Sequence, residues 1–337
     1  MADNDESHSH SHDHAHGHGH DHDHEHEHDH EHEEPTAEEI AQMQANFRKA
    51  GAAAASVIKE VPKLVVPGES VLDIAETLEK MIADAGAKPA FPANISINDI
   101  AAHFTPEADN KLLIGETDVV KIDIGAHIDG CIGDMAVTVD LSGEQGKLIE
   151  ASESALEAAI AGMKPGVAVG KIGTIIEREI DSRGFHPIEN LTGHKIEPYL
   201  LHAGVEIPNI SSSANYELVE GDVFAVEPFA SAGSGRVADT SQVEIFALQA
   251  NPRLRGKYAR ELLTHVLENY FSLPFAERWL AKIFNSRLTL STSLRELLGS
   301  GALHPYPVLR DTGRGLVSQK EHTVIIEHDS AKILTAQ

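Results

Sequence analysis

The feature that most constrains the fold is a weak internal repeat, in which the same signals recur about 100 residues apart. A Pro-Gly pair at 67–68 precedes an apolar stripe that ends at Gly86, and a second pair at 165–166 precedes a similar stripe that ends at Gly184. The stripe residues are Val71, Ile74, Leu78 and Ile82 in the first copy, and Val169, Ile172, Ile176 and Ile180 in the second. Because this spacing is typical of amphipathic helices, we expect two α+β halves related by a pseudo-twofold axis.

Two pairs of chemically active residues follow the same repeat. The segment ETDVVKID ends at Asp123 and the segment EGDVFAVE ends at Glu227, while His103 and His202 precede them in the two halves. If equivalent strands occupy equivalent places, Asp123 and Glu227 lie on opposite sides of one central cleft. The two histidines then flank this cleft as a second symmetric pair.

A predicted hairpin brings a second aspartate to the same cleft. Segments 119–128 and 131–141 are rich in β-branched residues, and an Asp-Gly pair at 129–130 joins them, which is a hairpin signal. Asp123 and Asp134 lie on the two strands among apolar neighbours. A buried carboxylate in such a place requires a counter-charge, and a metal ion is the expected one.

Three more residues complete an oxygen-rich set. His194 follows a glycine, Glu227 precedes a proline on an apolar strand, and Glu321 leads into the apolar run TVII. Together with Asp123 and Asp134 they offer four carboxylates and one imidazole, which suit two divalent ions such as Co, Mn, Fe or Zn. Such ions activate water and polarise a carbonyl group. We therefore expect a dinuclear hydrolytic centre.

The composition narrows the classes of protein to which the chain can belong. Its 337 residues, 41% of them hydrophobic, suffice for a large core. The single cysteine, Cys131, excludes an internal disulfide and fits a reducing cytosol. The sequence contains neither a long apolar span nor a secretory signal, so we expect a cytoplasmic protein that does not enter a membrane. The formal net charge of −26 argues against nonspecific binding of nucleic acid.

The first 35 residues form a low-complexity tail. Histidine occupies every even position from 8 to 32, and most residues between the histidines of the second half of this tract are acidic. Such a segment cannot build a core, so we expect residues 1–35 to be disordered. Two interpretations stay open: the tail buffers or delivers metal, or it only keeps the protein soluble.

Residues 251–308 interrupt the repeat and are interpreted as a helical insertion. They separate two parts of one catalytic domain, residues 36–250 and 309–337. The expected helical stretches are 259–271, 275–284 and 293–298. Between residues 251 and 310, Lys and Arg outnumber Asp and Glu by 9 to 4, although the chain as a whole is acidic. This positive charge could face ribosomal RNA, or the insertion could simply wall the groove.

Six motifs, in order, resemble those of the methionine aminopeptidases, and more narrowly the type 2 enzymes of archaea and eukaryotes. They are FPANISINDIAAHFTP, KIDIGAHIDGCIGD, LTGHKIEPYLLHAG, FAVEPFASAG, HPYPVL and KEHTVII, within residues 36–337. The resemblance implies the pita-bread fold, an α+β fold in which a curved antiparallel sheet is backed by helices. The insertion between the fourth and fifth motifs is what points to type 2.

The resemblance also implies a role for each metal ligand. Asp123 looks like the bidentate ligand of one ion, and Asp134 and Glu321 look like bridging carboxylates. His194 and Glu227 look like ligands of the other ion. Glu227 also looks like the general base.

Five further residues acquire substrate-binding roles from the resemblance. His103 and His202 look like the side chains that bind the scissile amide and stabilise the tetrahedral intermediate. Phe91, Phe229 and Tyr306 lie near motifs that line the methionine pocket of the family, where aromatic walls pack well against a thioether.

The implied activity is removal of the initiator methionine from nascent polypeptides, with a small second residue preferred. An Xaa-Pro peptidase of the same fold and ligand set is an alternative. A non-enzymatic relative that binds the ribosome or RNA is another, although such proteins lose ligands. We expect a monomer whose partners are nascent polypeptide N-termini and, through the insertion, the ribosome.

Overall fold

The computed structural model describes residues 35–284 and 286–336, so the predicted tail lies outside the described residues except for its last position. At the centre lies an antiparallel hairpin of β4 (Val119–Ile128) and β5 (Cys131–Asp140), paired without a bulge along its whole length. Asp129 (φ 50°) and Gly130 (φ 81°) form its turn in the left-handed conformation that a two-residue hairpin loop requires. The hairpin predicted from the Asp-Gly pair is therefore confirmed.

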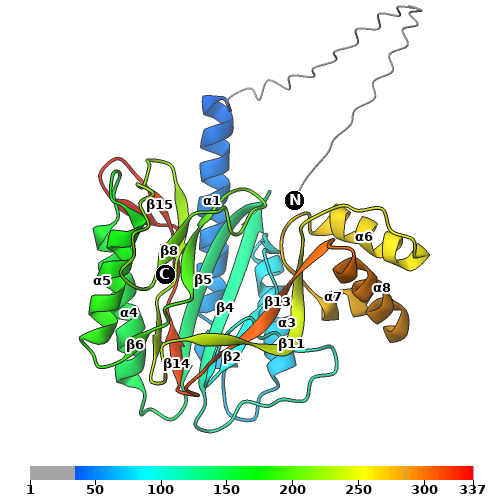
Figure 1. Ribbon diagram of the computed structural model, residues 1–337, viewed down its shortest axis with the longest axis horizontal. Helices are drawn as coiled ribbons and strands as arrows, with labels where there is room; N and C mark the ends of the chain where they lie inside the picture. Colours follow the sequence, from blue (N-terminus) through cyan, green and yellow to red (C-terminus); the bar gives the residue numbers. More distant parts are fainter. Residues whose placement is uncertain (1–34, 285, 337) are drawn as a thin grey trace, which may run out of the picture.

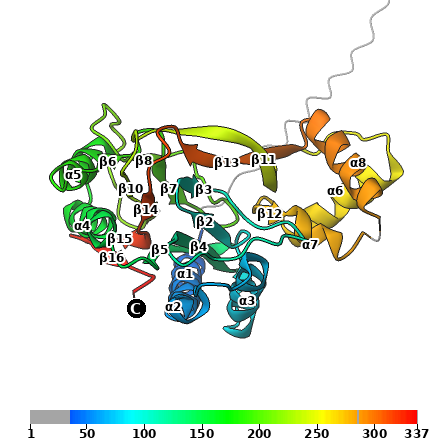
Figure 2. The same ribbon diagram turned by 90° about the horizontal axis from the view of Figure 1, so that it is seen from below.

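Three helices of the first half lie on one side of this hairpin (Figure 2): α1 (Ala37–Ile58), α2 (Val61–Leu64) and α3 (Val71–Asp84). α1 begins at a capping box formed by Thr36 and Glu39. It packs against β5 backbone to backbone, because a Cβ added at Gly133 would lie only 2.5 Å from the Cα of Gly51. This close approach fixes the strand immediately before Asp134. Two short strands, β1 (Lys88–Pro89) and β2 (Asn94–Ile97), pair with β4.

The second half repeats the pattern of sheet and helices. A five-stranded antiparallel sheet has the order β16-β15-β9-β7-β8. Its strands are β7 (Thr192–Ile196), β8 (Glu206–Pro208), β9 (Val223–Val226), β15 (His322–Ile326) and β16 (Ala331–Ile333). Helices α4 (Gly146–Gly162) and α5 (Val169–Asp181) cover this sheet (Figure 1). The apolar stripes of α3 and α5 are buried in two separate cores, as the repeat predicts.

Two further sheets of four and three strands complete the described part of the chain. One contains β12-β11-β13-β3, and the other contains β14-β10-β6. Their strands are β3 (Ile100–Ala102), β6 (His186–Pro187), β10 (Phe229–Ser231), β11 (Val237–Leu248), β12 (Phe275–Ala276), β13 (Leu303–Asp311) and β14 (Val317–Gln319). Figure 2 shows the β11–β13 ladder on the side of the molecule opposite α1 and α3. The cavity described below lies between these layers.

The insertion contains three helices, but Phe275 and Ala276 form a strand and residues 303–308 belong to β13. α6 (Lys257–Asn269), α7 (Glu277–Ala281) and α8 (Arg287–Gly299) pack around a core of their own at the end of the β11–β13 ladder (Figure 1). The expected helix over 275–284 is wrong at its start, because Phe275 and Ala276 pair with Phe246 and Ile245 of β11. Among the described residues, no helix is both long and apolar enough to cross a membrane.

One buried carboxylate at the end of β13 is expected to be important for stability. Asp311 is fully buried and accepts hydrogen bonds from the Oγ of Ser231 (2.8 Å) and from the amides of Gly313 (2.8 Å), Ser234 (3.2 Å) and Gly315 (3.3 Å). Asp311→Ala leaves these donors without an acceptor. We expect the free energy of unfolding to fall by about 2–4 kcal/mol, measured by urea denaturation.

The matched control is Asp329→Ala. Asp329 is exposed and bonds only to its neighbour Ser330 among the contacts described. This control is expected to change the free energy of unfolding by less than about 0.5 kcal/mol. Equal effects of the two substitutions would contradict the role given to Asp311.

Candidate metal centre and substrate cavity

The five predicted ligands come from both halves and meet between them. Asp123 lies on β4 and Asp134 on β5, and their side chains share a face because Asp123 pairs with Ala136, two residues along the strand from Asp134. From the second half, His194 lies on β7. Glu227 and Glu321 follow β9 and precede β15, two strands that pair with each other.

The distances among these side chains suit coordination of a common ion. The Nε2 of His194 lies 3.4 Å from Oε1 of Glu227 and 3.8 Å from Oδ2 of Asp134. Asp134, His194 and Glu321 offer ligand atoms that all lie within 4.8 Å of one another. Among the described residues, this is the one group of three or more ligand-type side chains that could share an ion.

Burial and mutual repulsion shape the electrostatics of the cluster. Burial raises the pKa of Asp123 to about 7. Burial first, and repulsion by neighbouring carboxylates second, raises the pKa values of Asp134, Glu227 and Glu321 well above their usual range. Burial also lowers the pKa of His194 well below its usual value, which leaves a neutral imidazole able to act as a ligand. A cation at this point would offset the repulsion among the four acids.

Unpartnered buried atoms show that the residues fit divalent ions. Within the part of the chain that the structure describes, Oδ1 of Asp123 and Oδ1 of Asp134 are buried and have no hydrogen-bond donor. Buried acceptors without partners are uncommon, because desolvation without compensation costs free energy. Coordination of metal would supply the missing partners, and the donor set of four carboxylates and one imidazole is suited to it.

Two residues that the sequence analysis did not identify support the acids. Gln319 is buried and donates from Nε2 to Oε2 of Glu321 at 3.2 Å. The hydroxyl of Thr323 accepts from the amide of Asp134 at 2.7 Å and donates to its carbonyl at 2.9 Å. Both lie two residues from Glu321, the spacing at which neighbours in an extended chain share a face, so this signal was available in the sequence.

One cavity of about 240 Å³ collects every predicted site residue. It is lined by Phe91, His103, Asp123, Asp134, His194, His202, Glu227, Phe229, Tyr306 and Glu321. Five apolar lining residues were not anticipated: Ala102, Leu191, Leu201, Ile245 and Pro274. Pro274 belongs to the insertion, so this segment forms part of the cavity wall. The roles of the individual side chains stay predictions.

The two symmetric histidines lie beside the acids. His103 is half-buried, has a positive φ of 65°, and places Nδ1 3.2 Å from the carbonyl oxygen of Pro307. Burial lowers the pKa of His103 to about 4, so its ring is neutral at pH 7. Since a carbonyl only accepts, Nδ1 carries the proton and Nε2 keeps a free lone pair. The ring of His202 lies 4.3 Å from that of His194, and Tyr306 packs edge-on against His103 at 5.5 Å.

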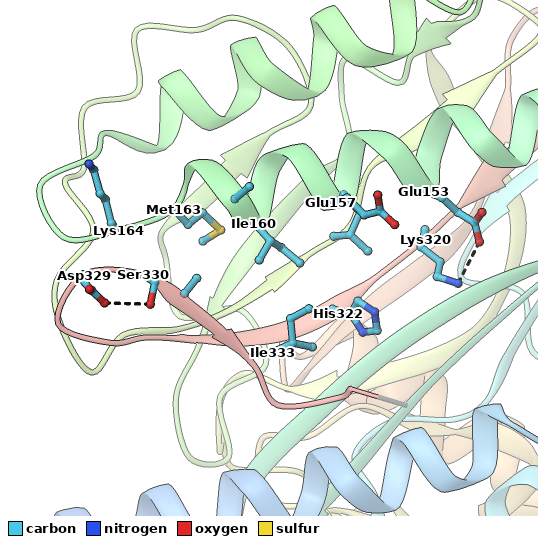
Figure 3. A pocket seen from close by; sticks show the side chains of 13 residues that line it. Glu153, Glu157, Ile160, Met163, Lys164, Lys320, His322, Asp329, Ser330 and Ile333 are labelled. Atoms are coloured by element: carbon cyan, nitrogen blue, oxygen red, sulfur yellow. Dashed lines mark hydrogen bonds and ion pairs between the residues drawn. The ribbon is translucent and has the colours of Figure 1, made fainter.

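Figure 3 shows a second concavity, a groove of about 580 Å³ between α4 and the β15–β16 hairpin. Lys320 and Glu153 form an ion pair of 3.1 Å at one end of this groove. His322, the residue after Glu321, lines it, whereas Glu321 lines the cavity. None of the ten predicted site residues borders the groove, so the chemistry is concentrated in the smaller cavity.

Comparison with known proteins agrees with this geometry. Residues 45–248 match metallopeptidase family M24. A methionine aminopeptidase of Pyrococcus abyssi is 49% identical over 289 residues, which cover 85% of this chain and 97% of the relative. Among solved structures, a methionine aminopeptidase of Thermotoga maritima has a TM-score of 0.65 at 24% identity, covering 90% of this chain and 98% of its own.

A thermophilic Arx1 has a TM-score of 0.76 at 19% identity, covering 87% of this chain and 90% of its own. These two structures share the fold of this chain, so the predicted pita-bread fold is confirmed. The matched family and the archaeal relatives together settle the membership. The chain belongs to metallopeptidase family M24, among its methionine aminopeptidases.

Proposed function

We propose that this protein removes the initiator methionine from nascent polypeptides with the help of two divalent metal ions. The observation that carries the proposal is the convergence of four carboxylates and one imidazole at a small cavity with aromatic walls. The names of the archaeal relatives support the same activity. The cytoplasm, where nascent chains are made, is the proposed location, and a monomer the proposed state.

The chain's own residues divide the work at this site. Asp123, Asp134, His194, Glu227 and Glu321 would hold two ions, with Co, Mn, Fe and Zn as candidates. When bound, these ions would activate water and polarise the scissile carbonyl. Glu227 is the proposed general base, which takes a proton from the attacking water and passes it to the departing amine.

Substrate recognition would depend on the histidines and the aromatic wall. The free Nε2 of His103 can accept a hydrogen bond from the amide at the scissile bond, and His202, which also lines the cavity, would stabilise the developing oxyanion. Phe91, Phe229 and Tyr306 line the cavity and would surround the methionine thioether. The small volume favours a small second residue.

Peptide specificity tests the proposed function directly. The protein supplied with metal is expected to release methionine from Met-Ala-Ser at least about a hundredfold faster than it cleaves an Ala-Pro dipeptide, measured by quantifying free amino acids. This order of rates is expected because the proposed pocket accepts a flexible thioether and a free α-amino group. The reverse order would replace the proposal with an Xaa-Pro peptidase, and no cleavage of either substrate would favour a non-enzymatic relative.

A second proposed partner is the ribosome, contacted through the insertion. Four cationic side chains at the start of the insertion are all exposed: Arg253, Arg255, Lys257 and Arg260. Reversal of all four to Glu is expected to weaken co-sedimentation with ribosomes at least about tenfold at 0.1 M salt, because contacts to phosphates depend on charge.

The control for this prediction reverses four exposed cations elsewhere, at Arg48, Lys49, Lys59 and Lys63. It makes the same change in net charge on α1, on α2 and between them. Equal losses of co-sedimentation for the two variants would show a general effect of charge and would contradict the proposal that the insertion binds the ribosome.

A further inference from the structure

One short segment of the insertion both lines the cavity and reaches back into the first half of the protein. Pro274 is part of the cavity wall, and β12 follows it and pairs with β11, where Ile245 also lines the cavity. α7 comes next, and from it Arg278 and Trp279 contact a glutamate on α3 of the first half. These two side chains therefore join the insertion to α3 of the first half.

The contact is a buried network of charged and polar groups. Arg278 is 2% exposed. Its Nη1 donates to Oε2 of Glu79 at 2.8 Å, and its Nη2 donates to Oε1 of Glu79 and to the hydroxyl of Thr105, the latter at 3.0 Å. The Nε1 of Trp279 also donates to Oε2 of Glu79, at 2.9 Å. Both partners of Arg278 are thus held by a single guanidinium.

Those same two partners hold Ala93, a residue whose neighbours line the cavity. The amide of Ala93 donates to Oε1 of Glu79 at 3.1 Å, and the carbonyl of Ala93 accepts from the hydroxyl of Thr105 at 2.8 Å. Ala93 lies between Phe91 and Asn94, which both line the cavity. The backbone that places these two side chains is therefore fixed on both sides by groups that Arg278 binds.

Other ion pairs between the insertion and the body are of a different kind. Lys282 with Glu76, and Arg287 with Asp109, join the same regions at 2.9 Å, but all four side chains are at least 42% exposed. Solvent screens such pairs, and they contribute little to structure. A bidentate guanidinium–carboxylate pair that is shielded from water imposes a defined geometry instead.

We propose that Arg278 is a positioning residue that sets the width of the methionine pocket by holding Ala93 through Glu79 and Thr105. The insertion thereby influences specificity at a part of the cavity that belongs to the first half, to which this buried network connects it. This inference rests on the proposed function, because the pocket is taken to receive methionine. Lysine at position 278 cannot reproduce the fork that binds two partners at once.

Kinetics of two matched variants test the proposal. Arg278→Lys is expected to lower kcat/KM for Met-Ala-Ser roughly tenfold, mainly through KM, and to reduce the preference for Met-Ala-Ser over Leu-Ala-Ser at least about fivefold. Lys282→Met, which removes an exposed pair of the same region, is expected to keep both values within about twofold. An unchanged preference in Arg278→Lys, with only a lower melting temperature, would overturn the proposal.

Substitutions at Thr105 provide a second test in case variants at Arg278 fold poorly. Thr105→Val removes the hydroxyl between Arg278 and Ala93 and is expected to reduce the preference for methionine in the same direction. Thr105→Ser retains the hydroxyl and is expected to restore the wild-type preference. Equal preferences in these two variants would contradict the proposal that Glu79 and Thr105 hold Ala93 in place.

Hydrogen exchange separates failure of this inference from failure of the proposed function. The amide of Ala93 is expected to exchange at least about tenfold faster in Arg278→Lys than in Lys282→Met, whether or not the protein cleaves peptides. A wild-type protein that releases no methionine would refute the proposed function. The exchange rate alone would then decide whether Arg278 holds Ala93 in place. Equal exchange rates in the two variants would refute it.

Discussion

Asp134→Ala is expected to abolish methionine release, with kcat/KM falling at least about a thousandfold. Asp134 lies 3.8 Å from His194, and its charge acts on both Glu227 and Glu321. The substitution removes a proposed ligand of both ions from the centre of the cluster, so both ions would bind more weakly. The measurement is release of methionine from Met-Ala-Ser by the variant supplied with metal.

The stability of this variant separates a catalytic effect from misfolding. In the presence of a chelator, Asp134→Ala is expected to unfold at a temperature no lower than the wild type, because one of four mutually repelling buried carboxylates is gone. The control is Asp129→Asn in the turn of the same hairpin, an exposed position that retains an acceptor for Asn46. It is expected to keep activity within about twofold. Substantial activity in Asp134→Ala would remove Asp134 from the metal centre.

Chelation of the wild-type protein is expected to stop methionine release and to lower the free energy of unfolding. An ion that binds only the folded state stabilises it by mass action, by about 2.7 kcal/mol when free metal is at 100 times its dissociation constant. Adding back Co, Mn, Fe or Zn one at a time is expected to restore stability and activity together. Thermal and urea unfolding, with and without each metal, measure the change.

The His-rich tail complicates a simple measurement of bound metal, because 13 histidines lie between positions 8 and 32. Histidines can bind metal ions in an unfolded chain as well as in a folded one. The contribution of the tail would then cancel in the free energy of unfolding, which reports the buried centre. Asp134→Ala is the control, and it is expected to lose most of the stabilisation by metal. If metal stabilised the wild type and Asp134→Ala equally, the stabilising ions would be bound outside the cluster.

Local signals made much of the fold predictable from the sequence. The turn at Asp129 and Gly130 and the stripes that begin at Val71 and Val169 each specify an element through residues adjacent to it. The helix expected over 275–284 was wrong at its start, because Phe275 finds a strand partner in Phe246, 29 residues earlier in the chain. Partners that distant leave no periodic signal nearby.

The residues of the candidate site were likewise predictable from the sequence only in part. The ligands are acidic or imidazole side chains in apolar surroundings, and this contrast is visible in the sequence. Gln319 and Thr323 lie two residues from Glu321, and this spacing is visible in the sequence. Arg278 has ordinary neighbours, and its importance arises from hydrogen bonds to groups brought near by folding. Arg278 and its partner Glu79 are separated by 199 residues, so composition and spacing could not have paired them.

Because the cluster takes side chains from both halves, it can be completed only at a late stage of folding. The hairpin that carries Asp123 and Asp134 can form early from local contacts, but β15, which follows Glu321, must insert beside β9 before the last carboxylate arrives. Glu321 leaves the ribosome about 200 residues after Asp123. Peptidase activity would therefore begin only after β15 has paired with β9, and folding intermediates that lack this strand would be inactive.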